Sequence, residues 1–274
     1  MALVLSLGAL IALGILLTST AAANSQPIAG VELHVCPTLE AGCDHTSIQS
    51  AVDAALPGAV IKVAAGLYTG LNVHEGVTQT VRIDKSLSLQ GGYTPANWSV
   101  PEPEVHVTTV DAQGQGIAIL VDNAGPVTIT GLDITAAGPA DVAGVLVSGG
   151  QVSISDCTIH DNWRGVKFLN ASGTVSSCTI ASNTLESFMY TGGAGVVIGS
   201  SRVTLRGNTI RDNVVRTTGE GGGSVYVYDS TITLEGNTIT GNVANETGVA
   251  KGGGIYLEQS DGTITGNRKH SCHR

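Results

Sequence analysis

Three tyrosines in the last quarter of the chain have the residue type and spacing of a carbohydrate-binding surface. Tyr226, Tyr228 and Tyr256 lie in two short runs in which β-branched or aliphatic residues alternate with other side chains. Alternation of this kind places every second side chain on one side of a strand, and we expect Lys167 and Glu258 at the edges of the same side. An exposed tyrosine ring can stack on a sugar ring while its hydroxyl remains hydrated. The competing interpretation is that these tyrosines are good strand residues that pack across neighbouring strands.

The carboxylates give no comparable pattern for catalysis or for a metal. Asp161 and Asp212 occupy equivalent turns but are separated by another repeat, so we expect them about 10 Å apart, beyond the spacing of a glycosidase pair. A third group, Asp111, Asp122 and Asp133, has a spacing of 11 residues that does not match the later repeats. We therefore predict no catalytic residue, no metal and no cofactor, and a Ca²⁺ site is unsupported.

The cysteines fall into two pairs and one isolated residue in the tail. Cys36 and Cys43 are close together near the N-terminus, which favours a local disulfide over a metal site that uses the flanking histidines. Cys157 and Cys178 occupy equivalent positions in two successive repeats. Packed thiols are the simpler interpretation, because a metal site needs four converging ligands, and oxidation of the pair to each other stays open.

These residues are carried by a repeated phrase with an isoleucine near its centre. The phrase occurs at residues 157–162, 178–183, 208–213 and 237–242, in clipped form at 262–267, and an earlier relative lies at 132–135. The isoleucines are residues 134, 159, 180, 210, 239 and 264, with intervals of 25, 21, 30, 29 and 25 residues. Short strands that recur at a period in the twenties predict a solenoid.

Each phrase ends on an asparagine, and we expect these side chains at one corner of every coil. An asparagine tolerates a left-handed backbone and can bond to the same turn of the next coil. The predicted structural ladder consists of Asn162, Asn183, Asn213, Asn242 and Asn267. The column that lies two residues before each isoleucine contains Cys157, Cys178, Asn208 and Asn237, and we expect it to be structural as well.

The only helical pattern lies between residues 46 and 56. Thr46 and Gln49 form a capping-box pattern, an apolar stripe follows, and Pro57 with Gly58 ends the pattern. Stacked coils need a cover over their open end, and this amphipathic helix is the expected cover. Strands are expected at residues 60–63, 81–83 and 87–89, with alternating strands through the repeats.

The segments TSIQSAVDAALPGAVIKVAAGLYTG and VRIDKSLSLQGGY resemble the opening of bacterial right-handed parallel β-helix proteins of the pectin-lyase-like superfamily. The repeats after residue 130 resemble their generic β-helix repeats, so the resemblance covers residues 46–267. It implies an all-β fold, a single-stranded right-handed parallel β-helix (solenoid) with a short N-terminal amphipathic capping helix. It implies little about activity, because the superfamily includes lyases, hydrolases, adhesins and proteins without known catalysis.

An apolar run over residues 2–17 precedes small residues that end at Ala23, which predicts a secretory signal peptide. The run lacks a preceding Lys or Arg, and an uncleaved anchor is the alternative. The expected organisation is a signal peptide (1–23), an N-terminal segment with a predicted disulfide (24–45), the β-helix domain (46–267) and an irregular basic tail, which we interpret as a truncation (268–274).

The composition limits the classes of partner that the protein is expected to bind. The net charge of −9 and the lack of a basic cluster before the tail argue against nucleic acid. We expect a secreted or cell-surface monomer without membrane contact after signal cleavage, and a polysaccharide or cell-surface glycan as its partner. The leading hypothesis is a non-catalytic glycan-binding or surface-binding solenoid. The alternatives are a polysaccharide lyase or glycoside hydrolase, and a structural spacer.

Overall fold

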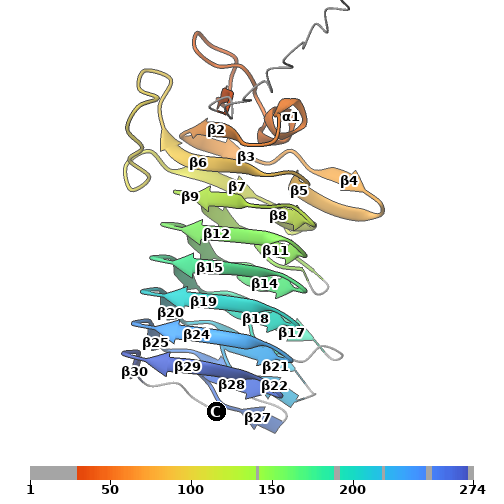
Figure 1. Ribbon diagram of the computed structural model, residues 1–274, viewed down its shortest axis with the longest axis vertical. Helices are drawn as coiled ribbons and strands as arrows, with labels where there is room; N and C mark the ends of the chain where they lie inside the picture. Colours follow the sequence, from red (N-terminus) through yellow and green to blue (C-terminus); the bar gives the residue numbers. More distant parts are fainter. Residues whose placement is uncertain (1–29, 140–141, 188–191, 218–219, 245–248, 271–274) are drawn as a thin grey trace, which may run out of the picture.

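The computed structural model describes residues 30–139, 142–187, 192–217, 220–244 and 249–270. The described chain forms a stack of coils with one short helix near its N-terminal end (Figure 1). The expected signal peptide lies outside the described residues. Residues 268–270, which we expected to be irregular, form strand β30 (Arg268–His270) and pair with the preceding coil. No helix among the described residues is long and apolar enough to cross a membrane.

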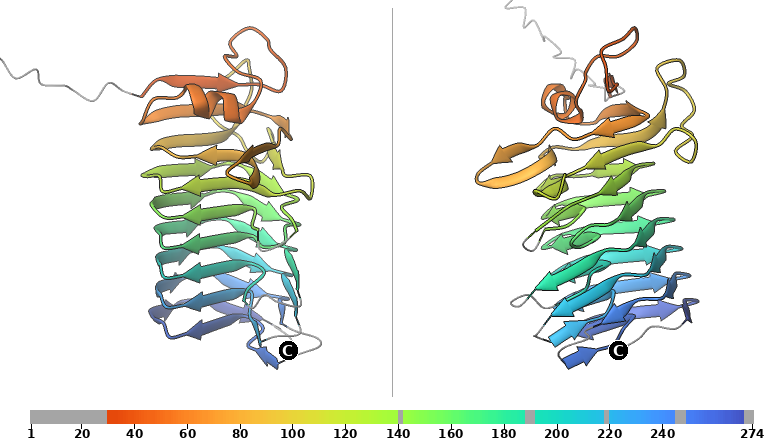
Figure 2. Two further views of the ribbon diagram at one scale, coloured as in Figure 1. Left: turned by 90° about the vertical axis from the view of Figure 1, so that its right-hand side faces the viewer. Right: turned by 180° about the vertical axis from the view of Figure 1, so that it is seen from behind.

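Each complete coil contributes one strand to each of three sheets, and Figure 2 shows these sheets from two further sides. The first sheet has nine strands: β1 (Glu32–Val35), β2 (Ala59–Ala64), β6 (Leu87–Tyr93), β9 (Val127–Thr130), β12 (Gln151–Ser155), β15 (Ser172–Ser176), β19 (Arg202–Arg206), β24 (Thr231–Glu235) and β29 (Asp261–Thr265). The second has eight: β3 (Gly66–Tyr68), β7 (Thr108–Asp111), β10 (Asp133–Thr135), β13 (Thr158–His160), β16 (Thr179–Ala181), β20 (Thr209–Arg211), β25 (Thr238–Thr240) and β30. The third also has eight: β4 (Asn72–His74), β5 (Val77–Ile83), β8 (Ile117–Asp122), β11 (Val145–Ser148), β14 (Val166–Leu169), β18 (Val196–Gly199), β23 (Val225–Tyr228) and β28 (Ile255–Glu258).

Pairing between coils in these sheets is parallel and, apart from one register shift between β2 and β6, in register. Among the strands that the structure describes, the antiparallel pair is the β4–β5 hairpin. Period-two alternation explains the strands, because it places apolar side chains inside the coil and polar ones outside. In β19, for example, Val203 and Leu205 are buried whereas Arg202 and Arg206 are exposed. Strand pairing therefore superimposes the inward residues of successive coils and forms one continuous core.

Five of the repeated isoleucines form a single column inside the second sheet. Residues 134, 159, 180, 210 and 239 pair in sequence across β10, β13, β16, β20 and β25, and each is at most 1% exposed. The prediction is wrong for Ile264, which lies in the first sheet, pairs with Leu234 and is 50% exposed. The repeat segment that contains Ile264 aligns with strand β24 of the first sheet, which begins at Thr231. In the second sheet, the residue that pairs with Ile239 is Lys269.

The longer repeat intervals result from segments inserted between the second and third sheets. These segments form a three-stranded sheet and a two-stranded sheet, composed of β17 (Thr184–Ser187), β21 (Val214–Thr217) and β26 (Val243–Ala244), and of β22 (Glu220–Gly222) and β27 (Val249–Lys251). Leu185, Ala194 and Val215 are fully buried there and pack with Trp163 as a small second core. The inserted segments thus add a local layer outside the main coil.

The helix α1 (Ile48–Ala54) lies at the N-terminal end of the stack. Its N-cap is Ser47, whose hydroxyl accepts a bond from the backbone N–H of Ser50, so the predicted capping box of Thr46 and Gln49 is wrong. Gln49 instead bonds to the exposed edge of β5. Its Oε1 accepts from the N–H of Arg82 at 2.6 Å, and its Nε2 donates to the Arg82 carbonyl at 3.3 Å. Gln49 therefore occupies backbone groups that a preceding coil would otherwise pair.

Candidate functional site

The tyrosine set predicted from the sequence has the expected register but not the expected exposure. Lys167, Val197, Tyr226 and Tyr256 follow one another in one column of the third sheet, and Tyr228 pairs with Glu258 in the next column. However, Tyr226 and Lys167 are each only 8% exposed. The predicted exposed aromatic platform is therefore wrong at its central residue.

Tyr226 is covered by glycine-rich backbone from the inserted segments. A Cβ atom added to Gly192 or Gly222 would lie 2.7 or 2.9 Å from atoms of the Tyr226 ring, so both backbones contact it directly. The ring also stacks on Tyr256, with a centroid separation of 5.6 Å. Its hydroxyl donates to Glu258 Oε2 at 2.6 Å, and burial together with this carboxylate raises the pKa of Tyr226. These tyrosines thus pack across neighbouring coils.

Amide side chains form ladders at two corners of the coil. At the corner between the second and third sheets, Asn162, Asn183, Asn213 and Asn242 bond in sequence through Nδ2 and Oδ1, at 2.9–3.1 Å. At the corner between the first and second sheets, Asn208 donates to Asn237, and Asn237 donates to Asn267. The assignment of Asn267 to the first ladder is wrong, because Asn267 lies just after strand β29 of the first sheet and bonds to Asn237 of the second ladder. The ladder residues are buried except Asn267, which is partly exposed, so both ladders serve to stabilise the stack.

Cys36 and Cys43 form a disulfide with a Cα separation of 5.8 Å. The loop that it closes lies near Trp98, whose ring stacks on His34 at a centroid separation of 4.1 Å. The Trp98 carbonyl accepts a bond from Lys62 Nζ at 2.6 Å. The disulfide-containing segment and the first sheet thereby hold the long loop between β6 and β7 against the stack.

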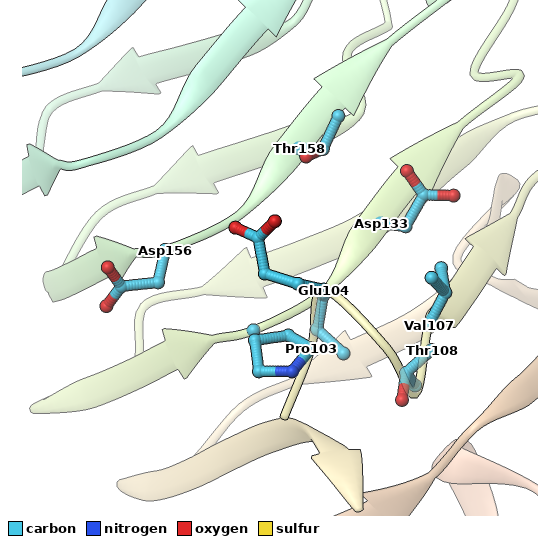
Figure 3. A pocket seen from close by; sticks show the side chains of 9 residues that line it. Pro103, Glu104, Val107, Thr108, Asp133, Asp156 and Thr158 are labelled. Atoms are coloured by element: carbon cyan, nitrogen blue, oxygen red, sulfur yellow. The ribbon is translucent and has the colours of Figure 1, made fainter. Parts of the chain in front are cut away.

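That loop forms one wall of a groove at the corner between the first and second sheets (Figure 3). The groove has a volume of about 250 Å³, and three acidic residues, Glu104, Asp133 and Asp156, are among those that line it. The other lining residues are Pro103, Val107, Thr108, Gly131, Leu132 and Thr158. Asp133 begins β10 and Thr158 begins β13, so adjacent coils supply the floor. Glu104 belongs to the loop in front of β7, and Figure 3 shows it projecting among these strands.

Asp133 is fixed by two contacts on the outer side of the second sheet. Its Oδ2 accepts a bond from the Thr109 hydroxyl at 2.9 Å, and its Oδ1 lies 2.9 Å from His160 Nε2. The other ring nitrogen of His160 lies 2.6 Å from Asp161 Oδ2. The hydrogen bond to Asp133, supported by Asp161, raises the pKa of His160 to about 9, so His160 is a cation at neutral pH.

Glu104 and Asp156 differ from Asp133 because neither carboxylate has a hydrogen-bond or ion-pair partner among the described residues. Both residues are exposed. Asp156 lies in a turn with a φ of 53°, at the corner position that glycine occupies in other coils, including Gly207 and Gly236. The groove consequently has two carboxylates that can accept hydrogen bonds from a ligand, next to a third, Asp133, whose charge His160 balances in part.

The sequence contained only part of the signal for this groove. Asp133 was identified, but as part of a set with Asp111 and Asp122. The structure separates that set, because Asp122 lies in the third sheet and pairs with Arg82 at 2.8 Å. Asp156 could have been recognised from the sequence, because it is the one acidic residue at a turn position that glycine or serine occupies in the other coils. Glu104 carries no periodic signal, because its loop is not part of a repeat.

The described residues contain one group of candidate metal ligands, namely Cys36, Cys43 and Glu40. Its two sulfurs are joined in the disulfide and are not available as thiolates, so this group does not fit a metal. Asp161 and Asp212 occupy equivalent turns with φ values of 51° and 54°, with Ser182 in the coil between them. The structure therefore does not bring these two aspartates into one site.

Comparison with known proteins places the fold in a family. Residues 102–269, more than half of the chain, match the family model described as the right-handed beta helix region. The chain therefore belongs to the right-handed β-helix family, which confirms the predicted fold class and the right-handed parallel solenoid. No curated protein matches the sequence.

Solved structures with a similar fold include enzymes that act on pectin. A pectate lyase, Pel9A, has a TM-score of 0.46 and 13% identity, with 89% of this chain and 80% of that chain covered. Pectin methylesterase PemA from Erwinia chrysanthemi has a TM-score of 0.45 and 10% identity, with coverage of 87% and 92%. Alginate lyase from a Paenibacillus species has a TM-score of 0.42 and 16% identity, with coverage of 83% and 96%. Likeness at this level concerns the fold and carries no argument about activity.

Proposed function

We propose that this chain is an exported, non-catalytic β-helix that binds a neutral glycan in the groove between the β6–β7 loop and the second sheet. The observation that supports the proposal best is that Glu104 and Asp156 line one groove and that neither carboxylate has a partner among the described residues. Sugar hydroxyls donate hydrogen bonds to carboxylates, and such bonds to charged acceptors are stronger than neutral ones. The Asp133 carboxylate and the Thr158 hydroxyl extend the same polar surface.

The loop wall of the groove also carries apolar side chains, which suit the C–H face of a sugar ring. Pro103 and Val107 lie on this loop beside Glu104, and Val107 is 46% exposed. A site with apolar walls and a few convergent polar groups is the usual form of a small-molecule site. The volume of about 250 Å³ is below the common range of ligand pockets, so one residue of a longer glycan is the expected occupant.

Charge favours a neutral glycan over a polyuronate. No Lys or Arg lines the groove, and the chain has a net charge of −9. A uronate would place a further carboxylate beside Glu104 and Asp156, and like charges in contact are unfavourable. The proposal thus keeps the expected glycan partner but replaces the tyrosine surface with this groove.

A glycan array tests the proposal. The full chain is applied to neutral oligosaccharides and to uronate oligosaccharides, beside the double variant Glu104→Gln, Asp156→Asn. We expect retention on a neutral glycan and loss of that retention in the folded double variant. Equal binding of the variant, or binding confined to uronates, would contradict the proposed site.

Glycoside hydrolysis is the second candidate, because a hydrolase uses two carboxylates beside one scissile bond. Glu104 and Asp156 line the same groove, and neither carboxylate has a hydrogen-bond or ion-pair partner among the described residues. Release of reducing ends from a bound neutral glycan by the chain, abolished separately by Glu104→Gln and by Asp156→Asn, would establish hydrolysis. Binding without release of reducing ends would leave the non-catalytic function.

A further inference from the structure

Two thiols occupy the same corner of successive coils. Cys157 and Cys178 lie immediately before β13 and β16, whose first residues, Thr158 and Thr179, are register partners. Each cysteine is 2% exposed. Adjacent backbones in a parallel sheet are about 4.8 Å apart, which falls within the Cα separations of about 4.4–6.8 Å that disulfides span.

The same corner carries the Asn208, Asn237 and Asn267 ladder in the following coils. There, the side chain of each asparagine bonds to the side chain of the next coil at 2.8–2.9 Å. The ladder ends at Cys178, whose N–H donates to Asn208 Oδ1 at 2.9 Å. Between Cys157 and Cys178 no amide side chain can link the coils. The two sulfurs donate instead to carbonyls two residues earlier, at 3.1 and 3.3 Å.

The two thiols also interact electrostatically. Their interaction lowers the pKa of Cys178 and, together with burial, raises the pKa of Cys157. A thiolate is the attacking species in disulfide exchange, and either cysteine can supply it once the coils open.

We propose that Cys157 and Cys178 are an inter-coil disulfide site, oxidised by exchange with a low-molecular-weight disulfide. The thiolate of one cysteine attacks one sulfur of the reagent and releases its first thiol. The sulfur of the other cysteine then attacks the mixed disulfide, loses its proton and releases the second thiol. Two protein thiols are oxidised and one reagent disulfide is reduced to two thiols. The bond covalently links two coils where the amide ladder is absent.

The chain already contains one disulfide, between Cys36 and Cys43. Disulfides persist in oxidising compartments, so conditions that maintain this bond also permit the second one. Because both thiols are buried, we expect oxidation to require opening of the coils, as occurs during folding or in mild denaturant.

Refolding the full chain with oxidised glutathione, followed by peptide mapping, tests this proposal. A Cys272→Ser background excludes exchange with the thiol in the tail. We expect a peptide pair linked through Cys157 and Cys178, and its absence when Cys178→Ser is added. Oxidant should raise the melting temperature of the Cys272→Ser protein about 5–10 °C more than that of the Cys178→Ser protein, because the Cys36–Cys43 bond forms in both.

The mapping is informative even if the serine variant does not fold, because it needs only the Cys272→Ser protein. Two cysteines that both react with an alkylating reagent after unfolding would show that no bond had formed. That result would overturn the proposal, as would glutathione adducts on either cysteine without the linked pair.

Discussion

His160 donates to Asp133 across adjacent coils, with 2.9 Å between His160 Nε2 and Asp133 Oδ1. The contact joins β13 to β10 on the outer side of the second sheet and fixes one carboxylate of the groove. His160 is bonded on its other side to Asp161 at 2.6 Å. The imidazolium thus lies between two carboxylates and balances part of their charge.

This contact predicts that stability falls as the pH rises above neutrality. The pKa of His160 is raised from 6.5 to about 9 in the folded protein. Below pH 6.5 both states hold the proton, so the full stabilisation is present. Between pH 6.5 and 9 the unfolded chain releases a proton that the folded chain keeps, and stability declines. Urea unfolding across this range measures the decline.

The variant His160→Gln is the control for the pH effect. It removes the titrating group, so the difference in unfolding free energy between wild type and variant should shrink as the pH rises through 9. A difference that stays constant across this range would contradict the assignment.

The amide ladder predicts a large cost for one internal asparagine. Asn213 Oδ1 accepts from the N–H and the Nδ2 of Asn183, and its own Nδ2 donates to the Ile180 carbonyl at 3.0 Å. Asn213→Ala leaves buried polar groups unpaired and should lower the unfolding free energy by at least about 2 kcal/mol. The half-exposed Thr209→Ala on the same coil should cost less than about 1 kcal/mol in the same urea titration. Equal costs would exclude a stabilising ladder.

Burial of Tyr226 predicts an effect on stability and none on ligand binding. Tyr226→Ala removes a ring that is 8% exposed and should cost about 3–5 kcal/mol. Tyr226→Phe loses only the hydroxyl contact with Glu258 and should cost about 1–3 kcal/mol. Thermal unfolding measures both. Loss of glycan binding in the folded Tyr226→Phe protein would restore the tyrosine surface as a candidate site.

The N-terminal cover depends on Gln49. Its amide bonds to both backbone groups of Arg82, at 2.6 and 3.3 Å. Gln49→Ala should therefore increase amide hydrogen exchange in β5 before it changes exchange in β20, because the opened edge is local. Gln49→Glu retains an acceptor for the Arg82 N–H and should have a smaller effect. Uniform exchange changes along the stack would contradict a capping role.

The repeat could be predicted from the sequence because identical side chains must stack for the core to form. The isoleucine column from Ile134 to Ile239 follows from that requirement alone. The register failed at Ile264 and Asn267 because first-sheet and second-sheet phrases of this chain are similar, with threonines around an aliphatic residue and an asparagine after them. Only strand pairing distinguishes the two.

The site was harder to predict because it depends on segments outside the repeat. Alternation correctly placed Tyr226 on the outer side of its strand, but periodicity does not show that Gly192 and Gly222 cover it. The position of Glu104 is set by a long loop that is held through Trp98 and Lys62. Contacts of this kind leave no period in the sequence.

Calorimetric titration of a neutral oligosaccharide identified on the array tests the central claim most directly. The proteins compared are the wild type, Glu104→Gln with Asp156→Asn, and the control Asp229→Asn. Asp229 is a matched control because it is an exposed aspartate with a left-handed φ of 47°, close to the 53° of Asp156. We expect the groove variant to bind at least about tenfold more weakly and the control to bind as the wild type does. Equal affinity of all three proteins would contradict the assignment of glycan binding to this groove.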